Sequence, residues 1–283
     1  MKQKMRIYQL AISVLLCISV IVFARDSFAQ DTNPNYRKGI EYAAEGKFRE
    51  AQGWFEDNLK SNKSDSTSIS SLGVINDLND GKITDVYARS FFAGLNHLQN
   101  GKIEEALKEM ESLIESKPGY PRPYNVVGVV YASLGDRVKS KEYFQKAVEI
   151  DPEYSVAYFN LALLYQSSAQ PEEALKYYEK TLSLDPKCFD AIINKAAIYA
   201  SRGKYSEAIQ FYQNAIKIDQ NNPEVYYNLA LAYYMSDQLV RFRDNLLKAK
   251  ELYQRNGDTA GLEKVAEYMN KMEEIENKAR RAR

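Results

Sequence analysis

Apolar residues recur at every third or fourth position through most of the chain beyond residue 32. Short turns containing Gly, Asp or Pro interrupt this pattern at regular intervals, as in YSVAYFNLALLYQSSAQPEEALKYYEKTLSLDP. Such spacing places the apolar residues on one face of an α-helix. The pattern therefore predicts a chain of amphipathic helices that are joined in pairs by short turns.

The helix pairs repeat with a period of 34 residues. Contiguous repeats begin at Tyr87, Pro121, Ser155, Phe189 and Pro223 and end at Asn256, and we count repeat positions from these residues as position 1. Four positions keep their character: position 8 is small (Gly94, Gly128, Ala162, Ala196, Ala230), position 11 is a ring (His97, Tyr131, Tyr165, Tyr199, Tyr233), position 20 is small except in the last repeat (Ala106, Ser140, Ala174, Ala208, Phe242), and position 24 is bulky (Met110, Phe144, Tyr178, Tyr212, Leu246).

The repeating residues have a physical explanation. Small residues at positions 8 and 20 let the two helix axes approach closely, and rings and long aliphatic chains fill the space around that contact. Glycines suited to a left-handed cap stand where the first helix must end, at Gly46, Gly101, Gly135 and Gly203. The repeat that starts at Ser155 lacks this glycine, and there Pro171 marks the boundary. Most of the tyrosines are thus expected to pack between helices.

This pattern resembles the tetratricopeptide repeat family over residues 32–65 and 87–256. The resemblance implies an all-α fold, a right-handed α-solenoid of helix-turn-helix repeats with a C-terminal capping helix. We expect a first repeat in 30–65, a degenerate and partly helical insertion in 66–86, five contiguous repeats in 87–256, and a capping helix with a basic tail in 257–283. The capping helix is suggested by an apolar stripe: Leu262, Val265, Met269, Met272 and Ile275.

The first 29 residues have the pattern of a secretory signal peptide. Lys2, Lys4 and Arg6 precede an apolar run, and a small-x-small site ends at Ala29. The alternative is an uncleaved anchor to the inner membrane formed by residues 7–24. Cys17 lies in the middle of the run, without the small residues before it that lipid attachment needs. We expect an exported protein, periplasmic or secreted.

Composition argues against an enzyme, and we expect neither a cofactor nor a metal site. The chain has one histidine, His97, and two cysteines, and we find no phosphate-binding loop or hydrolase motif. Cys188 is expected to be a partly buried free thiol. Lys plus Arg equals Asp plus Glu at 38 each, and without residues 1–29 the balance is 34 to 37. A nucleic-acid partner is not expected, since it would require a basic excess.

The resemblance implies that the first helix of each repeat lines a concave groove through positions 2, 5, 6, 9, 12 and 13. It therefore predicts a partner-binding groove with an apolar floor and amide groups: Arg122, Asn125, Phe159, Asn160, Leu163, Ile193, Asn194, Tyr227, Asn228, Leu231 and Tyr234. Asn160, Asn194 and Asn228 share position 6, where a row of amides can hold the backbone of a peptide. Asparagine is also common at this position without a known ligand, so repeat consensus remains an alternative explanation.

These observations predict a non-enzymatic scaffold that binds an extended peptide or an amphipathic helix of a partner protein, in a bacterial envelope. The family's clamp for a C-terminal carboxylate is missing, because Arg122 is the only cation at the required positions. A second hypothesis is a structural subunit that self-assembles through its outer face or terminal helix, giving a homo-oligomer with an unused groove. Membrane attachment is expected only through an uncleaved N-terminus.

Overall fold

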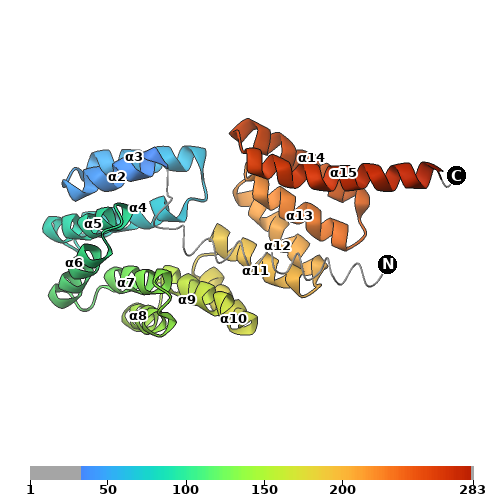
Figure 1. The fold of residues 1–283 in the computed structure, drawn as a ribbon. Helices are drawn as coiled ribbons and strands as arrows, with labels where there is room; N and C mark the ends of the chain where they lie inside the picture. Colours follow the sequence, from blue (N-terminus) through green and yellow to red (C-terminus); the bar gives the residue numbers. More distant parts are fainter. Residues whose placement is uncertain (1–32, 282–283) are drawn as a thin grey trace. The chain divides into compact units, whose positions relative to one another are not determined.

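The computed structural model describes residues 33–281, with side chains as far as residue 270. The predicted signal segment with Cys17, the alternative anchor 7–24 and Arg283 lie outside the described residues. Within them the chain forms fourteen α-helices and no strand (Figure 1). The helices are α2 (Pro34–Ala44), α3 (Phe48–Ser61), α4 (Ser66–Asn79), α5 (Asp85–Gln99), α6 (Ile103–Ser116), α7 (Pro121–Ser133), α8 (Arg137–Ile150), α9 (Ser155–Ser167), α10 (Pro171–Leu184), α11 (Phe189–Ser201), α12 (Tyr205–Ile218), α13 (Pro223–Met235), α14 (Leu239–Asn256) and α15 (Thr259–Arg281).

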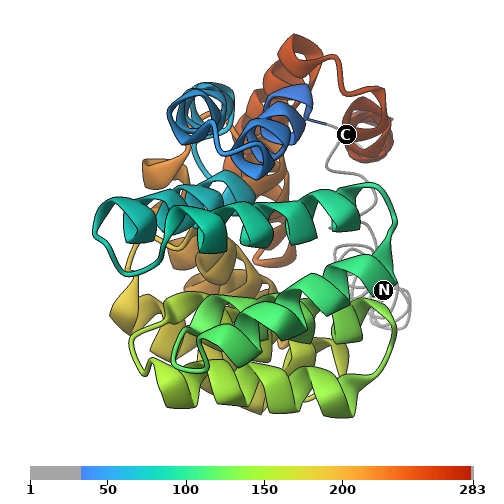
Figure 2. The same ribbon diagram turned by 90° about the vertical axis from the view of Figure 1, so that its left-hand side faces the viewer.

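The chain folds into two compact units, and the boundary falls inside α11, between Ala191 and Ile192. In the first unit, successive helices pair as hairpins: α2 with α3, α5 with α6, α7 with α8, and α9 with α10 (Figure 2). Neighbouring hairpins also touch, because α6 packs on α7 and α8 packs on α9. Their apolar faces form a continuous core from Tyr36 in α2 to Val130 in α7. The all-α repeat architecture predicted from the sequence is thus confirmed.

In the α5–α6 and α7–α8 hairpins, the glycine at position 8 meets the bulky residue at position 24. A Cβ atom added to Gly128 would lie 2.6 Å from the ring of Phe144, and the ring itself is 2% exposed. Ala162 and Tyr178 occupy the same positions in the next hairpin, and both are fully buried. The close helix approach expected from the sequence is therefore real, and it leaves no space for a larger residue at position 8.

A second aromatic pair recurs beside this contact. The ring at position 11 stacks on a ring at position 23, a position that the sequence pattern had not singled out. Tyr131 stacks on Tyr143 and Tyr165 stacks on Tyr177, with ring centroids 5.6 and 5.2 Å apart. In the next repeat, Tyr199 of α11 stacks on Phe211 of α12 at 5.5 Å, with the rings only 4° from parallel. The tyrosines at position 11 are confirmed as packing residues between helices.

Left-handed backbone ends the first helix of the repeats, as the glycine pattern predicts. Gly135 has φ 82°, and the glycines at the corresponding places have similar values. Where the sequence has no glycine, the backbone keeps the same conformation, with φ 54° at Ala169 and 60° at Asp237. The repeat geometry thus imposes a conformation that is unfavourable for a residue with a Cβ atom. Pro171 opens α10 as expected, but the turn before it is made by Ala169.

Helix α4 interrupts the series of hairpins. It packs mainly on α3, and α5 packs mainly on α2 and less extensively on α4, the helix that precedes it. Ser68 and Ser71 are buried on the side of α4 that includes Val74 and Ile75, and the latter two join the core. Asn58 of α3 donates hydrogen bonds to Asp65 at 2.8 Å and to Ser68 at 3.0 Å. The segment outside the repeat period therefore contains a complete helix that is fixed to the first hairpin.

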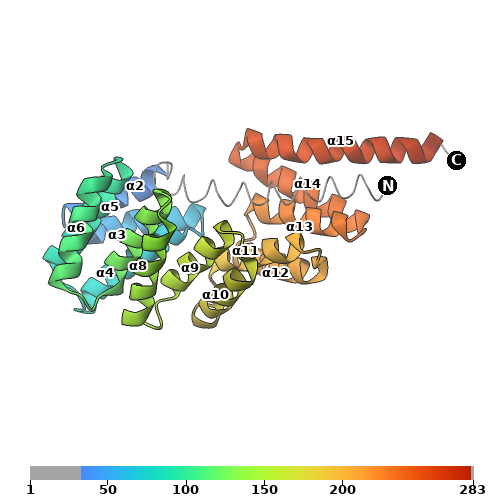
Figure 3. The same cartoon turned by 60° about the horizontal axis from the view of Figure 1, so that its bottom comes forward.

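The second unit continues the hairpin pattern. Helix α12 packs on α13, α13 pairs with α14, and α14 packs on α15 (Figure 3). Gly257, with φ 69°, ends α14, and Gly261 in the first turn of α15 approaches the ring of Tyr253. Val265 of α15 is 1% exposed. The helix predicted from the C-terminal apolar stripe therefore exists, and it covers part of the last hairpin.

Candidate functional site

The residues predicted to face a groove lie on α7, α9, α11 and α13, the first helices of four successive repeats. Most of these side chains are partly exposed, as a surface that can receive a ligand requires; Asn125, at 7% exposure, is buried. The unit boundary divides the set. Arg122, Asn125 and Asn160 belong to the first unit, whereas Asn194 and Asn228 belong to the second.

Two predicted amides meet in the first unit. The Nδ2 group of Asn160 in α9 donates to Oδ1 of Asn125 in α7 at 2.8 Å. The bond joins two neighbouring repeats, from position 6 of one to position 5 of the other. It uses one of the two donors of Asn160. Asn160 therefore has a structural role, and its amide has further capacity for hydrogen bonding.

The apolar part of this surface lies on α9. Phe159 packs against Tyr178 of α10 with ring centroids 5.9 Å apart, and Leu163 is half-buried one turn further along α9. The hydroxyl of Tyr178 donates to Oε1 of Gln166 at 2.6 Å. The side chain at position 24 thus packs against those at positions 5 and 12, which were predicted to face the groove. These contacts fix the side chains of Phe159 and Gln166 on the predicted surface.

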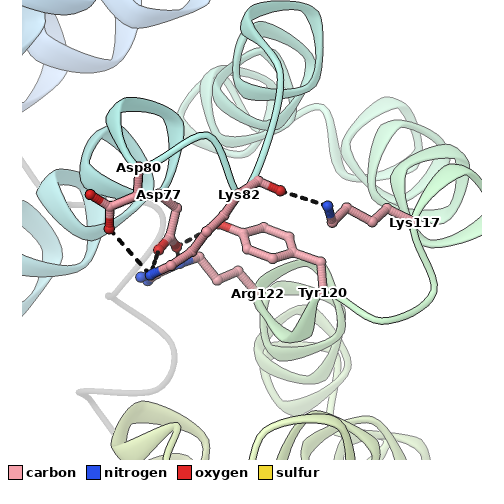
Figure 4. A network of polar contacts seen from close by, with 6 residues as sticks. All are labelled: Asp77, Asp80, Lys82, Lys117, Tyr120 and Arg122. Atoms are coloured by element: carbon pink, nitrogen blue, oxygen red, sulfur yellow. Dashed lines mark hydrogen bonds and ion pairs between the residues drawn. The ribbon is translucent and has the colours of Figure 1, made fainter.

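Arg122, the one predicted cation, belongs to a polar cluster between α4 and α7 (Figure 4). Its Nε donates to Oδ2 of Asp77 at 2.7 Å, and the hydroxyl of Tyr120 donates to the same oxygen at 2.8 Å. Lys82 donates to the other oxygen at 3.0 Å. The guanidinium also lies over the ring of Tyr154, 5.5 Å from its centroid.

Electrostatics within this cluster favour the charged forms. The side chains of Asp77 and Arg122 are only 11% and 15% exposed. Burial alone would raise the pKa of Asp77, but the charge of Arg122 and hydrogen bonds from Lys82, Arg122 and Tyr120 hold that pKa below its usual value. Sequence reasoning missed Asp77, because it lies outside the repeat period. The structure shows that Arg122 already has a partner within the chain.

In the second unit, the predicted aromatic residues meet the terminal helix. Tyr268 of α15 contacts the rings of Tyr227 and Tyr234 edge-on, with centroids 6.1 and 6.2 Å away. Lys264 of α15 forms an ion pair with Glu224 at 3.6 Å. Asn228 and Leu231 are half-buried on α13. The terminal helix thus occupies part of the surface that was predicted for a partner.

Helix α11 contributes Ile193 and Asn194, which are both half-buried. The adjacent Lys195 is 8% exposed, and its ammonium lies over the ring of Phe211 at 4.9 Å from the centroid. The row of Asn160, Asn194 and Asn228 crosses the boundary between the units, and its binding role stays a prediction.

Two titratable groups near the start of α11 are perturbed by burial. Desolvation raises the pKa of Asp190 to about 6, against a hydrogen bond from Ser66 that lowers it, and the charge of Asp65 contributes to the increase. Desolvation likewise raises the pKa of Cys188 to about 12, which makes its thiol a poor nucleophile. Cys188 is a partly buried free thiol. Among the described residues, no group of His, Cys, Asp and Glu side chains is placed to hold a metal ion.

Two further findings concern membrane-spanning helices and relatives of this sequence. Between residues 33 and 281, no helix is both long and apolar enough to cross a membrane. No curated protein matches this sequence.

Within each unit the described helices pack on their neighbours as hairpins, which defines an all-α helical-repeat protein. Two family models match the sequence: a tetratricopeptide repeat model over residues 121–187 and a TPR repeat model over 196–237. These matches identify tetratricopeptide repeats within residues 121–187 and 196–237 of the chain.

Solved structures share the fold. MamA from Desulfovibrio magneticus RS-1, from its residue 41 to its end, is 20% identical, covers 62% of this chain and 99% of its own, and superposes with a TM-score of 0.53. PilW, described as a type IV pilus biogenesis factor, is 18% identical over 65% of this chain and 91% of its own, with a TM-score of 0.53. YrrB, described as a TPR protein with an unusual peptide-binding site, is 20% identical over 75% of this chain and 97% of its own, at 0.50.

Proposed function

We propose that this protein is a non-enzymatic scaffold that is exported to a bacterial envelope and binds a segment of a partner protein along the first helices of its repeats. The observation that carries the proposal is the recurrence of accessible amide and apolar side chains at the same repeat positions on α9, α11 and α13. Such a surface offers both backbone hydrogen bonds and apolar contacts to a peptide or helix. The peptide-binding site that is described for YrrB supports the same use of this fold.

Export is part of this proposal and rests on the N-terminal sequence alone. The mature N-terminus expected after cleavage is Gln30. Mass spectrometry of the protein isolated from its native host tests this point directly. A chain that begins at Gln30 supports export with cleavage, whereas an intact Met1 supports the membrane-anchored alternative.

The binding surface is tested by replacing Asn160, Asn194 and Asn228 together with alanine. The wild-type chain first captures its partner from a native envelope extract, and the same partner is then tested with the variant. We expect at least about a tenfold loss of affinity, since each lost amide leaves peptide groups without a hydrogen bond. A matched control replaces three amides on second helices with alanine: Gln145, Gln210 and Asn214. Equal capture by both variants would remove the proposed binding row.

A second candidate function is self-assembly through α15. The length of α15 favours this function. The helix has 23 residues, whereas α14, against which it packs, has 18. Light scattering on the full chain and on a chain that ends at Asp258 tests this function. Loss of an oligomer on truncation assigns α15 to assembly, and the same monomeric mass for both chains contradicts this function.

A further inference from the structure

Helix α4 makes its polar contacts with later repeats through one stripe of its surface. Ser66, Gly73 and Asp77 are spaced by seven and four residues, which places them on the same side of a helix, three turns from end to end. The buried residues Ser68, Ser71 and Ile75 lie on the side that faces the first hairpin. The stripe is therefore a second, separate contact surface of α4.

Each end of the stripe contacts a residue at repeat position 2. Asp77 accepts hydrogen bonds from Arg122, the second residue of α7, and a Cβ atom on Gly73 would lie 2.7 Å from a guanidinium nitrogen of the same residue. Ser66 donates a hydrogen bond to Asp190, the second residue of α11, within the first unit. Position 2 is one of the positions that the family resemblance assigns to the concave groove. Helix α4 thus lies where a bound segment is expected.

Helix α4 is also intrinsically weak. Its sequence, STSISSLGVINDLN, consists largely of Ser, Thr, Asn, Asp, Gly and β-branched residues, and it contains no Ala, Glu, Lys or Arg. These residue types have low helix propensity, so tertiary contacts must hold α4 in its helical form. Elements of this kind open locally before the rest of a domain unfolds. A partner that reaches Arg122 and Tyr120 therefore competes with α4 for the same donors.

We propose that α4 is an intramolecular ligand of the groove, and that the residues it covers at the start of α7 form the docking site for a partner helix with a carboxylate and a neighbouring small residue. Arg122 and the hydroxyl of Tyr120 provide two donors for the carboxylate, and the ring of Tyr154 supports the guanidinium. The partner helix needs a small residue one turn before its carboxylate, because the guanidinium of Arg122 lies against Gly73 in α4. This inference rests on the proposed function and names the form of the ligand: a helix that replaces α4.

The test uses a fluorescein-labelled synthetic peptide of residues 64–81 and measures fluorescence anisotropy with the full chain. In the Asp77→Ala chain, the contact made by α4 is lost and Arg122 becomes accessible. We expect the peptide to bind this chain at least about tenfold more tightly than it binds the wild-type chain. Adding Arg122→Ala to the same chain, or Asp77→Asn to the peptide, should reverse the gain. The control chain carries Asp85→Ala, which breaks an exposed ion pair on α5.

Equal binding to the wild-type and Asp77→Ala chains, or binding that does not depend on Arg122, would overturn the proposal. Hydrogen exchange on the unmodified chain gives a second test that needs no variant. Amides of α4 should exchange at least about tenfold faster than those of α5. Exchange of α4 at the rate of α5 contradicts a displaceable helix. Failure of these tests leaves the asparagine row intact, because that row is tested with the native partner and different residues.

Discussion

The ion pair between Asp77 and Arg122 provides the sharpest test of the structure, because it joins the helix outside the repeats to the repeats themselves. The change is Arg122→Met, which keeps the length and the apolar part of the side chain and removes the charge. Asp77 then remains in a site where its side chain is only 11% exposed, with Lys82 and Tyr120 as its donors. The expected result is an uncompensated buried carboxylate.

The size of the effect follows from the burial of the pair. Removing one partner of a fully buried ion pair costs about 3–5 kcal/mol, and removing an exposed one costs about 0–1 kcal/mol. Asp77 and Arg122 are close to the buried limit, but two donors to the carboxylate persist in the variant. We therefore expect a loss of about 2–3 kcal/mol in the free energy of unfolding. The control is Lys176→Ala, because the Lys176–Glu173 pair is exposed and should cost less than about 0.5 kcal/mol.

Urea unfolding followed by far-UV circular dichroism measures the free energy, and hydrogen exchange locates the loss at α4 and α7. The double variant Asp77→Leu with Arg122→Met should lose less than the sum of the two single variants, since it leaves no unpaired charge. The cost of Arg122→Met should also shrink as the pH falls, because the variant loses the charge that holds the pKa of Asp77 below its usual value, and its carboxylate is protonated before that of the wild-type chain. A cost no greater than that of Lys176→Ala, or strict additivity in the double variant, would refute the reasoning.

Three further predictions concern backbone conformation, packing and pH. Ala169→Gly should stabilise the chain by about 0.5–1 kcal/mol in urea unfolding, because glycine relieves the left-handed backbone at this turn; a loss of stability contradicts this. Gly128→Ala should destabilise it by about 1–3 kcal/mol through a clash with Phe144, whereas Gly53→Ala, with open space around it, should not destabilise the chain. Asp190→Asn should raise stability by about 2 kcal/mol at neutral pH. Because the folded-state pKa of Asp190 is raised to about 6, this gain should vanish as the pH falls below about 4, and an equal gain at both pH values in thermal unfolding contradicts the assignment.

The sequence alone determined the repeating part of this protein. Three local features predicted it: apolar residues on one face of each helix, small residues at positions 8 and 20, and glycines at the turns. Each of them acts between residues of one hairpin or of two neighbouring hairpins. The contact of Gly128 with Phe144 spans only sixteen residues and recurs between Gly94 and Met110, so the period makes it visible. The candidate surface on α9 and α13 followed from the same period.

Only the tertiary structure decided which residues α4 and α15, the helices outside the repeats, contact. Nothing near Asp77 in the sequence indicates that it binds Arg122, which is 45 residues further along the chain. Nor does the pattern show that α15 places Tyr268 against Tyr227 and Tyr234. These contacts occur once, between surfaces that are brought together by the stacking of all the intervening helices. A contact that occurs only once leaves no signal in a repeat pattern. The contacts of α4 and α15 with residues of the predicted groove each occur once, so the sequence pattern did not predict them.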